Sequence, residues 1–334
     1  MVLYAIKRIL MLIPVLLGVT FITFTVIELR PSDAVELMLT GQEDPTRNPA
    51  IAEEIMDYVR EQRGLNDPFF TRYFRWVGGM VRGDFGVTLT TQLQVSELIA
   101  IRLPRTLQFA AMSTLLMVFI GVPIGVLSAA KQYSVFDVTS MMIAMFIASM
   151  PGFWVGLILV MYFSVQLGWL PSFGLRDWTS WILPTITLAL PFIGSMARLV
   201  RTTMLEVIRQ DYIRTIRAKG ASESYVISKH AFRNVLVPVA TSTGMSFGGM
   251  LGGAMIIENV FAFPGIGTLL IDSIMRLEIP SLLACVTIIA VAFCVLNLII
   301  DILYGWLDPR LKAQYISAGK FRLRLPGRPA KQGG

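Results

Sequence analysis

Six long runs of uncharged, mostly apolar residues constrain the fold of this chain more than any other feature. The runs cover residues 9–27, 106–130, 138–175, 178–197, 234–257 and 279–300. About 20 apolar residues in a helix cross the hydrocarbon core of a bilayer, and each run reaches that length. Charged residues make up only 15% of the chain, whereas soluble domains average about 25%. The sequence therefore predicts an all-α integral membrane protein.

The third run is too long for one straight helix, because at about 1.5 Å per residue it would exceed a hydrocarbon core of about 30 Å. Pro151-Gly152 interrupts it, so it forms either one broken, tilted span ending near Leu167 or two spans. Basic residues favour the cytoplasmic side of a membrane. Six spans with both termini inside place Lys131, the basic loop 198–233 and the basic tail in the cytoplasm. We therefore expect six spans.

The remaining segments complete a four-part organisation. Residues 1–29 are expected to form a retained N-terminal anchor span, and residues 30–105 an extracytoplasmic loop or cap with a helix at Ile51–Arg63. Residues 106–307 form the membrane core. The segment 308–334 is a basic cytoplasmic tail, disordered or in contact with lipid. The net charge of +7 is assigned to cytoplasmic loops facing anionic lipid and not to nucleic-acid binding.

A hydrophilic loop at 204–230 separates the fourth and fifth runs. Apolar residues recur in it at helical spacing, at Leu205, Ile208, Tyr212 and Ile216. Gly220 is expected to end that helix, since glycine tolerates a left-handed backbone. Ser222 is expected to cap a second short helix with Glu223 in its first turn. The pattern predicts two short helices meeting at a glycine corner, a compact knob suited to a cleft on a soluble partner.

The same loop carries a resemblance to a known family. It reads Asp211-Tyr212-Ile213-Arg214-Thr215-Ile216-Arg217-Ala218-Lys219-Gly220, followed by His230-Ala231, Arg233-Asn234 and Pro238. It resembles the coupling loop of bacterial ABC-importer permeases of the dipeptide and oligopeptide branch, which also includes nickel and glutathione transporters. Ile216 stands where that branch usually has alanine. Further matching segments are Arg82-Gly83-Asp84-Phe85-Gly86, Glu258-Asn259-Val260-Phe261, Pro264-Gly265-Ile266-Gly267 and Leu307-Asp308-Pro309-Arg310.

The resemblance implies a non-catalytic permease subunit with type I ABC-importer architecture in the bacterial inner membrane. It implies a second homologous permease, two ABC ATPases that bind ATP and Mg, and a periplasmic or lipid-anchored binding protein that delivers a peptide. This chain itself is expected to bind no cofactor or metal. The residues assigned to ATPase coupling are Asp211, Tyr212, Arg214, Thr215, Ile216, Arg217, Ala218, Lys219, Gly220, His230 and Arg233.

Candidates for the translocation path or its gates carry a weaker signal. Gly248 and Gly252 belong to a series of glycines that permits close helix approach, either near the path between two permeases or within this chain alone. Asn297 and Asp301 share a polar stripe that either lines the inner mouth of the path or bonds neighbouring helices near the headgroups. Glu258, at the outer end of the fifth span, is a candidate outer-gate residue.

Two alternatives remain at the level of sequence. Within the same family the cargo is nickel, glutathione or a short saccharide. From another class, the chain is an ATP-independent secondary transporter or channel, although no internal repeat is detectable and mid-membrane charges are scarce. The sequence contains no phosphate-binding Gly-x4-Gly-Lys-Ser/Thr motif, so it is not expected to be the ATPase.

Overall fold

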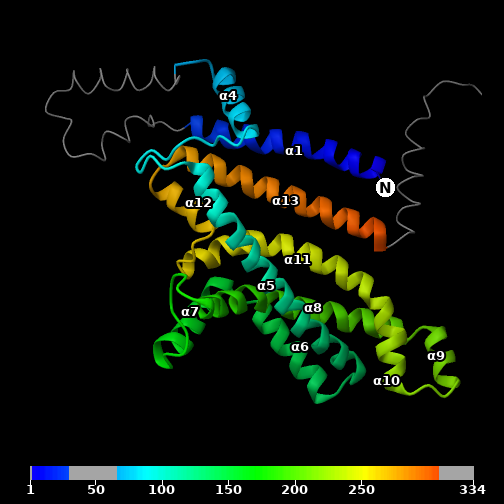
Figure 1. Cartoon of the computed structure of the whole chain (residues 1–334). Helices are drawn as coiled ribbons and strands as arrows, with labels where there is room; N and C mark the ends of the chain where they lie inside the picture. The colour runs from blue at the N-terminus through cyan, green and yellow to red at the C-terminus, as the bar shows by residue number, and fades with distance from the viewer. Residues whose placement is uncertain (1, 30–65, 308–334) are drawn as a thin grey trace, which may run out of the picture.

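The structure, a computed structural model, describes residues 2–29 and 66–307, and these residues are predominantly helical (Figure 1). Its helices are α1 (Val2–Glu28), α4 (Phe69–Val81), α5 (Val95–Ala130), α6 (Val135–Ala148), α7 (Gly152–Leu159), α8 (Ile182–Ile208), α9 (Asp211–Ala218), α10 (Glu223–Tyr225), α11 (Phe232–Val260), α12 (Ile266–Met275) and α13 (Ile279–Leu307). A π-helical segment at Val160–Gln166 extends α7, and another at Val226–Ala231 precedes α11. A 3₁₀ turn at Trp178–Trp181 precedes α8. The predicted helix at Ile51–Arg63 and the tail 308–334 lie outside the described residues.

Among the described residues, five helical stretches are long and apolar enough to cross a membrane, at Ile9–Glu28, Val95–Ala130, Trp178–Ile208, Glu223–Val260 and Ile279–Ile300. The third apolar run forms α6 and α7, which are bent by 103° relative to each other. Pro151 occupies the N-cap position of α7, where its missing N–H costs no helical hydrogen bond. Counted as one broken span, the bent pair brings the number of candidate spans in the described part of the chain to six, in agreement with the predicted all-α membrane fold.

The helices are arranged around α8, which packs against α5, α6, α7 and α11. The N-terminal end of α1, the C-terminal end of α13 and the α9–α10 segment lie at one end of the bundle (Figure 1). Helices α4 and α12 lie at the opposite end. We refer to these as the α9 end and the α12 end.

Small residues bring the backbones of α5, α6 and α8 into direct contact. A Cβ atom added at Gly125 of α5 would lie 2.5 Å from the carbonyl oxygen of Ala197 in α8. One added at Gly194 of α8 would lie 2.5 Å from the carbonyl oxygen of Ala144 in α6. Because lipid supplies no hydrophobic force between helices, such close backbone packing is what holds spans together.

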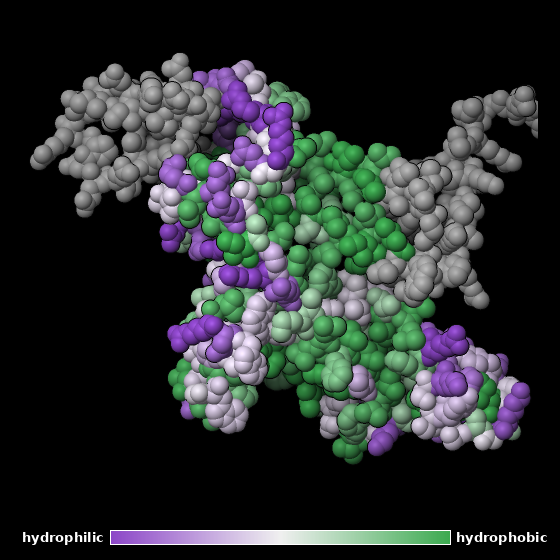
Figure 2. All heavy atoms as spheres, viewed as in Figure 1, coloured by the Kyte–Doolittle hydropathy of each residue, from purple (hydrophilic) through white to green (hydrophobic). Residues whose placement is uncertain are grey.

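On the face seen in Figure 2, apolar side chains cover much of the bundle, while hydrophilic residues gather near α4, beside α7 and at α9. Large apolar side chains such as Phe119 and Leu115 are 81% and 70% exposed. Helix α1 is the least enclosed span, since only 6% of its apolar window is buried, and it packs mainly against α13. An exposed surface of this kind is expected of a chain that meets lipid or other membrane subunits.

Helices of the described chain extend beyond the uncharged runs from which they were predicted, as α5, α8 and α11 show. Helix α5 begins at Val95, so the end of the segment 30–105 forms its first turns. Helix α8 continues to Ile208, and α11 is preceded without interruption by the helical residues from Glu223. Charged residues mark the edge of the hydrocarbon core and not the end of a helix, because helical hydrogen bonds continue equally well in water.

Candidate coupling site and the Glu258 junction

Helix α9 is a separate element and not a continuation of α8. Helix α8 ends at Ile208, and Gln210 is extended (φ −72°, ψ 150°) at the N-cap position of α9. The apolar stripe is therefore divided, with Leu205 and Ile208 on α8 and Tyr212 and Ile216 on α9. The prediction of one continuous helix through these four positions was wrong, because helical spacing continues across a short break when the two helices fold onto the same core.

The second predicted short helix also differs from expectation. Residues from Glu223 onward form α10 and a π-helical turn, Val226–Ala231, that runs directly into α11. Ser222 takes the N-cap position, but its side chain forms no capping hydrogen bond. His230 lies inside this continuous helix, with its ring edge-on to Tyr225 at 5.2 Å between centroids. The segment after the glycine corner is thus an extension of the fifth span.

One side chain of α9 is fully buried, and it fixes which face of the helix meets the bundle. Ile213 is 0% exposed and belongs to the main hydrophobic core, together with Val207 of α8 and Val226 and Val235 from the other side of the corner. Ile216 is partly buried against the same core. Tyr212 was expected on this face, but the residue is 36% exposed.

Polar contacts fasten both ends of α9 to the start of the fifth span. The Asn234 side-chain amide donates a hydrogen bond to the Tyr212 hydroxyl at 2.6 Å. The Arg217 guanidinium donates two hydrogen bonds to the Glu223 carboxylate, at 2.9 Å and 2.6 Å. This carboxylate raises the pKa of Arg217 above its ordinary value. Gly220 lies between these partners with φ +83°, which confirms the predicted left-handed corner.

The remaining coupling candidates form the exposed surface of the knob. Asp211, Arg214, Thr215, Ala218 and Lys219 are all exposed. Arg214 and Asp211 approach to 3.6 Å on this surface, where such a pair contributes little to stability. Arg233 is exposed in the first turn of α11. The predicted residues therefore divide into some that hold α9 on the bundle and others that form a charged surface, exposed within the described part of the chain.

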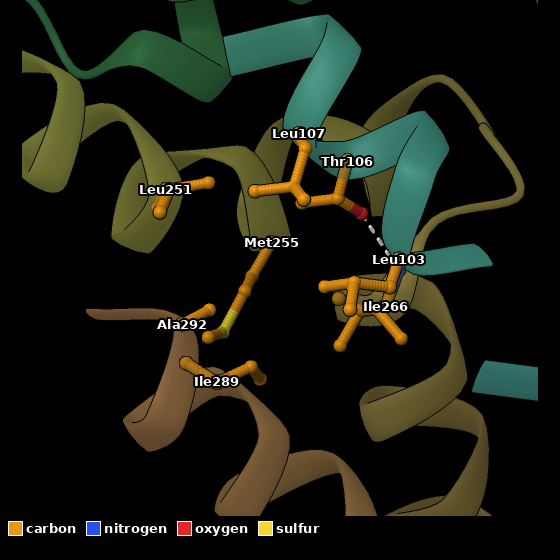
Figure 3. Close-up of a pocket in the computed structure, with 9 residues that line it drawn as sticks. Leu103, Thr106, Leu107, Leu251, Met255, Ile266, Ile289 and Ala292 are labelled. Atoms are coloured by element: carbon orange, nitrogen blue, oxygen red, sulfur yellow. Dashed lines mark hydrogen bonds between the residues drawn. The ribbon is translucent and has the colours of Figure 1, made fainter. Parts of the chain in front are cut away.

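At the α12 end, the carboxylate of Glu258 is buried in a polar junction. Glu258 is 0% exposed in the last turn of α11. It accepts hydrogen bonds from the Thr106 hydroxyl at 2.6 Å and from the backbone N–H of Gly267 at 2.7 Å. Thr106 in turn accepts one from the backbone N–H of Ile266 at 2.9 Å, drawn dashed in Figure 3. These residues, called the Glu258 junction, join α5 and α11 to the N-terminus of α12.

The junction explains the Pro-Gly-Ile-Gly sequence in physical terms. A Cβ atom at Gly265 would lie 2.1 Å from a Glu258 carboxylate oxygen, and one at Gly267 would lie 2.3 Å from the Cα of Met255. A carboxylate is favourable here because the first N–H groups of a helix lack intrahelical partners. Phe263, 1% exposed, closes the turn against Trp181 at 4.7 Å between ring centroids. The structure thus places the Glu258 side chain in the tightly packed contact between α5, α11 and the N-terminus of α12.

The cavity beside this junction is small and apolar. Leu103, Leu107, Leu251, Met255 and Ile289 point into it around Thr106 and Ile266 (Figure 3). Its volume is about 20 Å³, which accommodates about one water molecule. It is not a site for a peptide.

The other path candidates do not converge on one site. A Cβ atom at Gly248 would lie 3.2 Å from the Phe293 ring of α13, which favours packing within this chain. Gly252 is exposed, and nothing lies within 4 Å of such an atom. Asn297 is exposed, and its amide donates to the Phe293 carbonyl oxygen at 3.0 Å. The side chain of Asp301 lies outside the described part of the molecule.

A hairpin-like loop at residues 86–94, at the α12 end, was not predicted. The Glu278 carboxylate, 6% exposed, accepts hydrogen bonds from the backbone N–H groups of Leu89 and Thr90 at 2.5 Å and 2.8 Å. Gly83 and Gly86 have φ of +82° and +79°, and the Asp84 carboxylate accepts from the Gly86 N–H at 2.9 Å. The Arg-Gly-Asp-Phe-Gly segment therefore builds the turns of this loop.

A partly buried ion pair between α6 and α8 was also missed. Asp137 is 2% exposed, and Arg201 donates to both of its carboxylate oxygens, at 2.5 Å and 2.7 Å. The only sequence signal was one acidic and one basic residue at the edges of apolar runs. Sixty-four positions separate the two residues, so no local pattern connects them. Among the described residues, no group of three or more His, Cys, Asp or Glu side chains could hold a metal ion.

Known proteins resemble the chain along almost its whole length. Residues 121–313 match the family described as "Binding-protein-dependent transport system inner membrane component", and residues 1–110 match its N-terminal counterpart. The oligopeptide transport system permease protein AppB of Bacillus subtilis (strain 168) is 41% identical over 92% of this chain and 99% of its own length. The dipeptide transport system permease protein DppB of Alkalihalophilus pseudofirmus is 37% identical over 93% of this chain and 100% of its own. The glutathione transport system permease protein GsiC of Escherichia coli (strain K12) is 36% identical over 92% of this chain and 98% of its own.

The fold is similar to that of a solved ABC transporter. An inward-facing structure of the MetNI methionine ABC transporter contains a chain that aligns with a TM-score of 0.54 at 17% identity, covering 63% of this chain and 96% of that one. At this identity the likeness concerns the fold alone. The two family matches and the identities of 36–41% over more than nine tenths of the chain settle its membership: this protein belongs to the family of binding-protein-dependent transport system inner membrane components.

Proposed function

We propose that this chain is the permease subunit of an ATP-driven importer of dipeptides or oligopeptides, and that α9 couples it to the ATPases. The observation that carries this proposal is the construction of α9. It presents a charged surface away from the bundle, yet Ile213 is 0% exposed in the core and both ends are hydrogen-bonded to the fifth span. The cargo is proposed from the names of the relatives, two of which refer to peptides.

The proposed assembly has two permeases, this chain and a homologous one, around a central path. Two ATPases bind ATP and Mg and dock on the α9 end, which faces the cytoplasm because the loop 198–233 is rich in basic residues. A binding protein delivers the peptide at the α12 end, where α4 and the loop held by Glu278 lie. This chain supplies no catalytic group of its own.

Mechanically, α9 has two routes into the membrane. Ile213 seats it on the core shared with α8, and the Tyr212–Asn234 and Arg217–Glu223 contacts fasten it to the helix that becomes α11. A displacement of α9 by closing ATPases is therefore passed to two spans together. Both spans run to the opposite end of the bundle, where α11 carries the Glu258 junction (Figure 1). Alternating access then follows from sliding of packed helices.

The first test is affinity purification of the tagged chain under gentle conditions, with identification of its companions by mass spectrometry. Recovery of a second permease and of ATPases with phosphate-binding loops is the expected result. A chain that purifies alone and moves solute into vesicles without ATP would contradict the proposal and favour a secondary transporter.

A second test uses the glycine corner itself. Arg217→Glu places two carboxylates at 217 and 223, so we expect loss of ATP-driven uptake with normal membrane insertion. The exchange of both residues, Arg217→Glu with Glu223→Arg, recreates an ion pair and is expected to recover uptake. Wild-type uptake in the single variant would argue against a coupling role for this corner.

A further inference from the structure

The carboxylate of Asp137 in α6 contacts residues of α5, of α8 and of the turn before α6. Its oxygens accept hydrogen bonds from the Arg201 guanidinium of α8, from the backbone N–H of Tyr133 at 2.9 Å and from the Ser128 hydroxyl of α5. Asp137 is 2% exposed and Ser128 is 0% exposed. We call these four residues the Asp137 junction. It ties the start of α6 and the turn before it to α8.

The α5–α6 turn does not need this ion pair for its own geometry. Ser134 already caps α6, because its hydroxyl accepts a hydrogen bond from the Asp137 backbone N–H at 3.2 Å. Asp137 is buried, whereas the Arg201 side chain is 23% exposed. Burying a charge costs free energy unless it is well paired, and apolar residues often replace a buried pair without loss of stability. The bidentate contact instead fixes the position and direction of α6 relative to α8, which a single apolar contact does not.

The junction also lies close to α9 along a rigid element. Arg201 precedes the end of α8 at Ile208 by seven residues, which is about 10 Å along a helix. Immediately before this stretch α8 packs tightly on α5, since a Cβ atom at Gly125 would lie 2.6 Å from the Cβ of Val200. A displacement of α9 that moves this end of α8 therefore acts directly on Arg201.

Helix α6 is held to α8 at a second point, and it leads to the far end of the bundle. The second point is the backbone contact between Gly194 and Ala144. After the 103° bend, α7 packs against Phe261, because a Cβ atom at Gly156 would lie 3.2 Å from that ring. Phe261 belongs to the turn that leads into the Glu258 junction. A continuous series of packed contacts thus runs from α9 through α8, α6 and α7 to the α12 end.

We infer that Asp137 and Arg201 are positioning residues that make α6 move as one body with α8, so that motion of α9 reaches α7 and the turn after α11. The inference rests on the proposed function, since it requires ATPases that act on α9. Without the bidentate contact, α6 remains inserted and packed at Gly194 but slides relative to α8 during the cycle. Hydrolysis then continues while transport falls.

The test measures peptide uptake per ATP hydrolysed by the complete transporter in proteoliposomes, together with the melting temperature of the purified complex. Arg201→Lys retains the charge but loses the planar fork, and the expected result is a drop of at least tenfold in uptake per ATP. Asp137→Asn is nearly isosteric, so it guards against misfolding, and a smaller drop of several-fold is expected. Lys131→Gln removes an exposed charge from the same turn and is the matched control, with an unchanged ratio.

The outcomes separate the inference from the proposed function. If uptake and hydrolysis fall in equal proportion with the melting temperature, the ion pair acts only on stability and the inference is overturned. An unchanged ratio in both Arg201→Lys and Asp137→Asn overturns it as well. ATP-independent uptake by the wild-type complex would instead overturn the proposed function, and the inference with it.

Discussion

Truncation of Ile213 tests whether core burial holds α9 in place. Ile213 is the one residue of α9 with no exposed surface, and its neighbours come from α8 and from the start of the fifth span. Replacing it with alanine removes buried methyl groups and leaves a cavity in their place. Helix propensity works in the opposite direction, because alanine is the better helix former. Any loss of order in α9 therefore arises from packing.

The expected magnitude follows from known core truncations. An Ile→Ala change in a well-packed site costs about 2–5 kcal/mol, and Ile→Val about 0.5–1.5 kcal/mol. At about 1.4 kcal/mol per factor of ten, Ile213→Ala lowers the ratio of docked to undocked α9 roughly 30-fold to several thousand-fold. Ile213→Val lowers it roughly 2- to 12-fold. Once undocked, the eight residues of α9 are too few to stay helical in water.

Amide hydrogen exchange across residues 211–218 in the purified complex measures the equilibrium between docked and undocked α9. We expect faster exchange in the order wild type, Ile213→Val, Ile213→Ala, with a parallel fall in uptake per ATP. Thr215→Ala is the matched control, since it also replaces a β-branched residue of α9 but at an exposed position, and its exchange should not increase. Equal exchange in Ile213→Ala and wild type would refute the argument that burial of this side chain holds α9.

Two further predictions concern the α12 end. Gly265→Ala places a methyl group on the Glu258 carboxylate and is expected to destabilise the complex by about 1–3 kcal/mol, seen as a lower melting temperature. Gly252→Ala is the control, because a Cβ atom there meets nothing within 4 Å, and it should melt as wild type does. Equal melting temperatures of the two variants would contradict the proposed clash. Glu278→Ala leaves two backbone N–H groups of the loop 86–94 without their acceptor, so limited proteolysis should cut this loop faster than in wild type while the bundle stays intact; an unchanged cutting rate would show that the loop is held by other contacts.

Much of the architecture could be predicted from the sequence because each span is identified by its own contiguous residues. A run of about 20 uncharged apolar residues has few alternatives to a membrane helix, and Pro151 marks a break whatever surrounds it. Gly220 likewise indicated its own corner, since a left-handed backbone is a local property of the residue. The loop proposed for ATPase coupling was recognisable for the same reason: its motif is contiguous in the chain.

What the sequence could not supply were relations between distant segments. Nothing local pairs Asp137 with Arg201, or places the N–H groups of Leu89 and Thr90 on Glu278. Helical spacing also could not show that α9 breaks away from α8, because two helices folded onto one core preserve the same apolar period. Glu258 illustrates the difference most clearly. The sequence showed that Glu258 lies at the end of a span. Only the tertiary structure shows that its carboxylate caps α12, because the partners of a buried carboxylate come from segments that folding brings around it.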